Sequence, residues 1–132
     1  MQEKRDRDKK YDLEKRLIDF AVRVISVVES LPNTRAGNHI ASQLVRCGTS
    51  PASNYGEAQS AESRSDFIHK IKIVLKELRE TRVWLRIIQR KNLVKSDNEI
   101  KILVSECDEL ISIFVTSAKT AEKNKHKKKR EP

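Results

Sequence analysis

Hydrophobic residues recur every three or four positions along four stretches of this chain, and this spacing predicts four amphipathic helices. The stretches cover about residues 11–31, 38–58, 64–92 and 97–119. Short polar connections separate them. Long helices joined by short connections are typical of an antiparallel up-down-up-down four-helix bundle, so we expect an all-α protein of this architecture.

One hydrophobic stripe on each helix is expected to face the core. The stripes are Leu13, Leu17, Phe20, Val24, Val28 and Leu31; Ile40, Leu44 and Cys47; Phe67, Ile71, Val74, Leu78, Leu85 and Ile88; and Ile100, Leu103, Cys107, Leu110, Ile111, Phe114 and Ala118.

Two helices carry more hydrophobic residues than one buried face needs. The surplus indicates contact with another helix or another subunit, because large apolar patches are rarely left in water. The candidates for such an interface are Ile18, Val22 and Ile25 on the first helix and Ile73, Trp84 and Ile87 on the third.

The helix ends are marked by local signals. Pro32 ends the first helix, and residues 33–37 are expected to form a turn. Ser63 with Asp66, and Ser96 with Glu99, have the spacing of capping boxes.

The stretch from Cys47 to Asn54 consists of small residues with Pro51 in its middle. A proline removes one helical hydrogen bond and clashes with the preceding turn. The residues alone leave two alternatives open, a loop that divides the second helix or a kinked continuous helix. The polar side chains of Thr49, Ser50, Ser53 and Asn54 are expected to bond backbone carbonyls or one another, with a functional pocket as the sharper alternative.

The two ends of the chain lack the hydrophobic pattern. Residues 1–10 are charged and have no apolar residue after Met1, which predicts a frayed helical extension or a disordered arm. Residues 120–132 are expected to be a disordered basic tail. The bundle domain is therefore predicted to span residues 11–119.

Positive charge is concentrated in the third helix and the tail. Residues 64–95 contain ten Lys and Arg against three Asp and Glu, while the whole chain has a net charge of +9. Helical spacing gathers part of this charge on one face, where it suits phosphate groups. Acidic residues of the fourth helix could neutralise some of it. The candidate nucleic-acid-binding residues are Lys72, Lys76, Arg79, Arg82, Arg86 and Arg90, with Lys127, Lys128, Lys129 and Arg130 in the tail.

The sequence offers little for catalysis, metals or membranes. His39, His69 and His126 lie far apart in sequence, and the two cysteines, Cys47 and Cys107, suit buried apolar positions better than ligand or nucleophile roles. A pair of His39 and Cys47 is the nearest approach to a nucleophilic arrangement. We therefore expect a non-enzymatic protein without cofactor or metal. We also expect it to be cytoplasmic, since no apolar run is long enough for a signal or a membrane span.

Several motifs resemble the "four-helix bundle protein" family, whose members are encoded in intervening sequences of bacterial large-subunit rRNA genes. They are the Gly-Thr-Ser-x-x-x-Asn segment at 48–54, Glu57-Ala58, Asp66-Phe67-Ile68, Lys76-Glu77 and Trp84-Leu85. The resemblance implies an antiparallel bundle, a continuous kinked second helix and a homopentamer around a central channel. The chain is also similar to the accessory protein of diversity-generating retroelements, a basic pentamer that binds nucleic acid and partners a reverse transcriptase.

Together these features predict a basic oligomeric scaffold that binds the RNA or DNA backbone and a protein partner such as a reverse transcriptase. The alternative is a purely structural or protein-interaction bundle with no nucleic-acid ligand.

Overall fold

Residues 2–130 fold into four α-helices in the computed structural model, which describes the backbone of these residues and the side chains of residues 13–125. The helices are α1 (Gln2–Ser30), α2 (Arg35–Gln59), α3 (Arg64–Lys91) and α4 (Asp97–Arg130). Within this part of the chain there is no β-strand. The prediction of an all-α four-helix bundle is confirmed.

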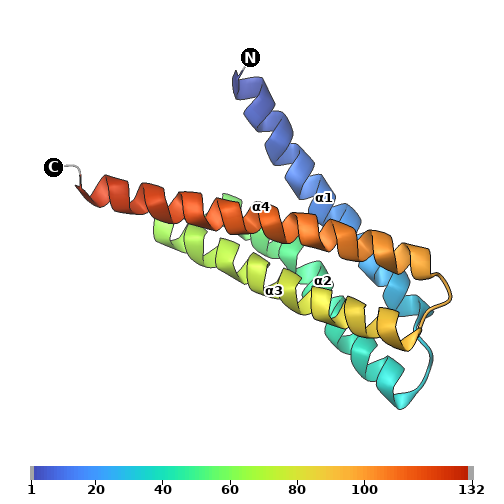
Figure 1. Ribbon diagram of the computed structural model, residues 1–132. Coiled ribbons are helices and arrows are strands. Elements are labelled where there is room, and N and C mark those ends of the chain that lie inside the picture. The colour runs from blue at the N-terminus through green and yellow to red at the C-terminus, as the bar shows by residue number, and fades with distance from the viewer. Residues whose placement is uncertain (1, 131–132) are drawn as a thin grey trace.

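Neighbouring helices pack to very different extents. The most extensive contacts join α2 to α3 and α3 to α4, followed by α1 with α2, whereas α1 and α4 meet over a short stretch only. Figure 1 shows the reason, since the first turns of α1 point away from the other three helices. The α1–α4 side is therefore the most open side of the bundle.

A single hydrophobic core lies between the helices. Its largest fully buried side chains include Phe20, Phe114 and Leu78, and most of the predicted inward-facing residues are buried. Val27, Ile68 and Leu75 are buried as well, although the sequence stripes left them out. Leu13, Val28, Leu31, Phe67 and Ile111 are only partly buried at the margin of the core. These differences between the predicted and the observed core are small, because neighbouring positions on one apolar face of a helix are almost equally well placed to reach the core.

Side-chain caps fix the starts of three helices. The hydroxyl oxygens of Ser63 and Ser96 accept hydrogen bonds from the backbone N–H groups of Asp66 (3.0 Å) and Glu99 (3.3 Å), as the sequence predicts. The start of α2 differs from the prediction. Thr34 caps it by accepting from Gly37 N–H at 3.0 Å, so α2 begins at Arg35 and most of the expected turn at 33–37 is helical.

α2 continues without interruption through Pro51, so the continuous form of the second helix is confirmed. Gly48 sits at the contact with α1, where a Cβ atom would lie 2.5 Å from Cγ1 of Val24. A residue with no side chain at this position lets the two helices approach closely. Gly48, three residues before the proline, therefore serves packing between α1 and α2.

Both outer helices are longer than the hydrophobic pattern predicts. α1 starts at Gln2 and takes in the charged segment, and α4 runs to Arg130, eleven residues past Lys119. Lys, Glu and Ala favour a helix, and no Gly or Pro interrupts residues 119–130. Local propensity thus extends α4 beyond the residues that can be buried.

Candidate nucleic-acid interface

The predicted basic residues of α3 form a continuous stripe on the outside of the bundle. We use "the basic stripe" for Lys72, Lys76, Arg79, Arg82, Arg86 and Arg90. All are exposed except Arg82, which is partly buried. The opposite face of α3 supplies Ile71, Leu78 and Leu85 to the core, each without exposed surface. The 3.6-residue period of the helix thus separates the charged face from the buried face.

Two of the six residues form ion pairs with α4. Lys72 Nζ lies 2.5 Å from a carboxylate oxygen of Glu122, and the Arg82 guanidinium pairs with the Asp108 carboxylate. These contacts neutralise two of the six cations of the stripe.

Among the described residues, the other acidic side chains of α4 form no ion pair with the basic stripe, in contrast to the expectation from the sequence that they neutralise part of it. Glu106 and Glu109 pair with Arg16 of α1, at 2.5 and 3.2 Å. Asp97 pairs with Lys101 within α4 itself. The reason is geometric, since Glu106 and Glu109 lie on the side of α4 that faces α1.

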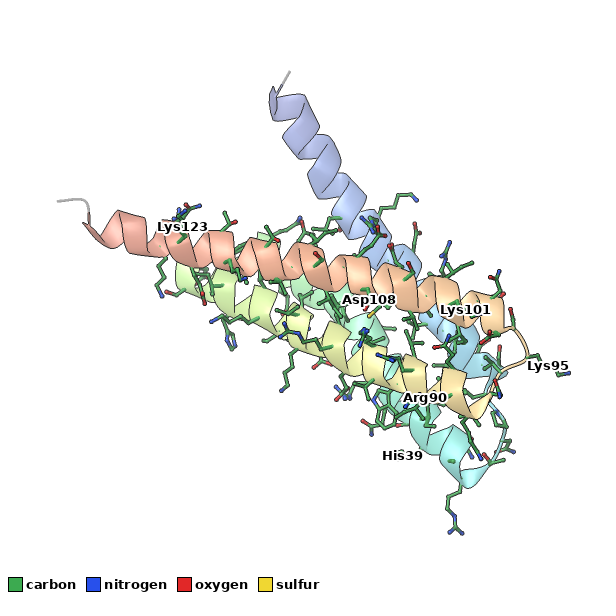
Figure 2. All side chains as sticks on the ribbon, in the orientation of Figure 1. His39, Arg90, Lys95, Lys101, Asp108 and Lys123 are labelled. Carbon is green, nitrogen blue, oxygen red and sulfur yellow. The ribbon has the colours of Figure 1, made fainter. Side chains whose placement is uncertain are left out.

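Four cations of the basic stripe are left without a carboxylate partner among the described residues: Lys76, Arg79, Arg86 and Arg90. Arg90 lies near the carboxyl end of α3 in Figure 2. From Lys76 to Arg90 the stripe extends about 21 Å, at ~1.5 Å per residue. The structure thus leaves a ridge of free positive charge on one helix.

The tail residues Lys127, Lys128, Lys129 and Arg130 belong to the last turns of α4 by their backbone. Their side chains lie outside the described residues. Their assignment as nucleic-acid contacts stays a prediction from the sequence.

The interface candidates of α1 form an exposed apolar patch. We use "the α1 patch" for Ile18, Val22 and Ile25, which are 48%, 57% and 40% exposed. Val45 of α2, 36% exposed, is a further surface hydrophobe that the sequence analysis did not single out. The signal for Val45 in the sequence is a hydrophobic residue directly after the buried Leu44. At this position it lies beside the buried stripe of α2 and not in it.

The three candidates on α3 have unequal environments. Ile87 is 39% exposed, whereas Ile73 and Trp84 are partly buried. The Trp84 ring meets the His39 ring of α2 edge-on, with the ring centroids 5.8 Å apart. Its buried indole N–H has no hydrogen-bond acceptor among the described residues. Part of the Trp84 side chain is therefore already buried within the chain, between α3 and α2.

The polar residues around Pro51 bond locally. The hydroxyls of Thr49 and Ser53 donate to the carbonyls of Val45 (2.6 Å) and Ser50 (3.0 Å). The Asn54 amide donates to both the carbonyl and the hydroxyl of Ser50. These bonds match the expectation of side chains that satisfy the helix backbone.

The cysteines have the properties of core residues. Both are fully buried, and burial raises the pKa of the Cys47 and Cys107 thiols to about 12. A nucleophilic cysteine needs the opposite shift. His39 is exposed and packs on Trp84, so the structure does not bring it to the Cys47 thiol as an activating base.

No group of three or more His, Cys, Asp or Glu side chains within residues 13–125 is arranged to hold a metal ion. Over the described helices, none is both long and apolar enough to cross a lipid bilayer. What the fold presents is an all-α bundle with a basic ridge on α3 and an apolar patch on α1.

This architecture defines a class of small basic four-helix proteins, and comparison with known proteins narrows the class to one family. Residues 9–116 match the model of the 23S rRNA-intervening sequence protein family, and the chain belongs to that family. None of the curated proteins matches the chain.

A solved structure is similar as well. It is a protein with unknown function from the S23 ribosomal protein family of Bacteroides thetaiotaomicron VPI-5482, 30% identical in sequence. The match covers 81% of this chain and 98% of that one, with a TM-score of 0.74. The sequence resemblance to the rRNA-associated family is therefore confirmed, along with its four-helix fold.

Proposed function

We propose that this protein is a non-enzymatic, basic scaffold that binds the phosphate backbone of nucleic acid through α3. One observation carries the proposal: Lys76, Arg79, Arg86 and Arg90 lie on the outer face of one helix with no carboxylate partner among the described residues. Unpaired cations in a row attract a polyanion, and phosphates release condensed counterions when they are neutralised.

Binding of this kind is independent of base sequence. Lysine and arginine contacts to phosphates position a protein on nucleic acid but carry no base information. The exposed neighbours of the stripe on α3 include Val83 and Ile87, neither of which can form a hydrogen bond with a base edge. We therefore expect strong dependence on salt and weak dependence on sequence.

Assembly into a homo-oligomer, a pentamer by family resemblance, is part of the same proposal. The α1 patch supports it, because three exposed branched residues on one helix face lose contact with water when a second copy covers them. An oligomer would also repeat the basic stripe once in each copy. Weak phosphate contacts then gain from avidity.

An antiparallel order of the helices is also proposed, with support from the ion pairs between α3 and α4. Lys72, early in α3, meets Glu122, late in α4, and Arg82, later in α3, meets the earlier Asp108. In Figure 1 the α1–α2 and α3–α4 loops lie at the same end of the bundle.

We further propose a protein partner such as a reverse transcriptase and a cytoplasmic location, both on the strength of the sequence alone. The basic stripe is compatible with a role beside an enzyme that handles nucleic acid.

A titration of nucleic-acid binding against salt tests the role of α3. In the variant Arg79→Glu/Arg86→Glu we expect affinity at low salt to fall at least about ten-fold, and the log–log salt slope for duplex DNA to shrink by about 1.8, or ~0.9 for each lost contact. The matched control is Arg23→Glu/Arg35→Glu, which changes the net charge equally at exposed positions on α1 and α2.

Equal losses in the two variants would show that net charge alone causes binding, and would overturn the assignment to α3. No binding of the wild-type protein to RNA or DNA at low salt would favour the alternative of a purely structural or protein-interaction bundle.

A further inference from the structure

A second row of positive charge lies beside the amino-terminal part of the basic stripe, and it comes from α4. Lys119 and Lys123 are exposed, and they flank Glu122 in sequence. Glu122 is bonded to Lys72 of α3 at 2.5 Å, so this part of α4 lies against the start of the stripe. We use "the α4 row" for Lys119 and Lys123.

The α4 row exists because α4 is longer than its hydrophobic pattern. The sequence pattern predicts that the helix ends at Lys119 and that Lys123 lies in a disordered tail. Residues 97–130 instead form one helix, so the two lysines stand one helical turn apart in fixed register. Figure 2 shows Lys123 near the carboxyl end of α4, far from Arg90 at the other end of the bundle.

The two rows stand on neighbouring helices, an arrangement that suits the two strands of a duplex. Axes of packed helices lie about 8–10 Å apart. The grooves of B-DNA have widths of the same order, about 6 Å for the minor and about 12 Å for the major groove. Two rows of cations at such a spacing can contact the two phosphate backbones that border a groove, whereas a single strand supplies only one backbone.

The same surface lacks the features that hold a single strand. Proteins bind single strands in basic grooves lined with aromatic rings, on which the bases stack. Among the described aromatic side chains, Phe20, Tyr55 and Phe114 are buried, and Trp84 packs against His39 of α2. Phe67 is partly buried against the core.

The described hollows of the bundle lie elsewhere. One of about 310 Å³ lies between α1 and α4, and its lining includes Arg23, Val27 and Ile102. Another, near the start of α3, is lined by residues such as Ser63, Phe67 and Ala121. Neither hollow includes a residue of the basic stripe or the α4 row.

We propose that the ligand of this surface is double-stranded nucleic acid, with α3 on one phosphate backbone and the α4 row on the other. The inference rests on the proposed function and specifies its ligand class. Because the contacts are to phosphates, duplex DNA and duplex RNA share the required chemistry.

Fluorescence anisotropy across a series of salt concentrations tests the inference. The full chain is titrated with a labelled 20-bp DNA duplex, an RNA duplex of the same sequence, and each single strand. We expect the wild-type protein to prefer at least one duplex to its single strands. The variant Lys119→Gln/Lys123→Gln is expected to reduce the salt slope for duplex DNA by about 1.8, at ~0.9 per contact, and to leave single-strand binding unchanged.

The matched control is Lys91→Gln/Lys95→Gln, which removes two exposed lysines at the other end of α3 and in the following loop. It should preserve the ratio of duplex to single-strand affinity. Circular dichroism checks that both variants keep the helical content of the wild-type protein.

Equal affinity of the wild-type protein for duplex and single strand would overturn the inference and leave the proposed function intact, as would equal losses for both ligands in the α4-row variant. Absence of binding to every probe would overturn the proposed function itself. Preference for the DNA or the RNA duplex identifies the source of the ligand, and either preference supports the inference.

Discussion

Gly48 shows how closely one residue can determine the approach of two helices. A Cβ atom there would lie 2.5 and 2.9 Å from the two γ-carbons of Val24, a valine with no exposed surface. Because Val24 is enclosed by the core, it cannot move aside freely. The contact makes Gly48 part of the α1–α2 interface, and it gives a structural reason for one residue of the Gly-Thr-Ser segment.

We predict that Gly48→Ala lowers the free energy of unfolding by about 1–3 kcal/mol through overpacking against Val24. The matched control is Gly56→Ala on the same helix, where an added Cβ meets no atom within 4 Å. The control should gain about 0.5–1 kcal/mol, since alanine is the better helix former. Urea unfolding monitored by circular dichroism measures both. A stable Gly48→Ala protein would contradict the close contact.

At the scale of the elements, the two faces of α3 have different roles, one in the apolar core and one in presenting positive charge. Its inner face contributes Ile71, Leu78 and Leu85 to the core, and its outer face carries the unpaired cations. α4 reduces the free charge of this outer face, because Asp108 and Glu122 form ion pairs with two of its cations. The strength of the proposed interface therefore depends on which side of α4 carries acidic residues.

Asp108→Asn should raise affinity for nucleic acid about two- to five-fold, because it releases Arg82 to make one more phosphate contact. The salt slope for duplex DNA should grow by about 0.9. Exposed ion pairs contribute only about 0–1 kcal/mol, so the fold should remain stable. The measurement is the same salt titration.

The control for this prediction is Glu109→Gln, which removes one negative charge from the same helix on the side that pairs with Arg16. It should change affinity much less than Asp108→Asn. An equal gain in both variants would mean that the ligand senses net charge and not the position of Arg82.

At the scale of the whole molecule, the open α1–α4 side and the exposed α1 patch set one helix apart from the other three. α1 contributes Leu17, Phe20 and Val24 to the core, yet it also exposes Val22 at 57%. A helix that is apolar on two sides is suited to lie between a subunit core and a neighbouring subunit.

For the oligomer, we predict that light scattering gives a wild-type mass near five times the 15.3 kDa of one chain. Val22→Glu should shift the mass toward that of one chain, because a carboxylate cannot be covered by an apolar surface without a large desolvation cost. Ile102→Glu, at a similarly exposed site on α4, should keep the wild-type mass. A monomeric wild-type protein, or equal effects of the two changes, would remove the α1 patch from the interface.

The sequence by itself determined the elements. The apolar spacing gave the four helices and most of the core, and the serines at 63 and 96 gave two of the caps. The Lys and Arg spacing placed the basic stripe on one face of α3. These features depend on local geometry, since the helical period alone decides which residues share a face.

Only the tertiary structure decided which charges and which hydrophobic residues stay available. Glu106 and Glu109 form ion pairs with α1, whereas Asp108 forms one with α3. The Trp84 ring packs against His39 of α2. The ion pair between Lys72 and Glu122 shows that the α4 row lies beside the start of the basic stripe. Such pairings depend on how helices far apart in the chain are rotated against one another, and a one-dimensional period does not contain that rotation.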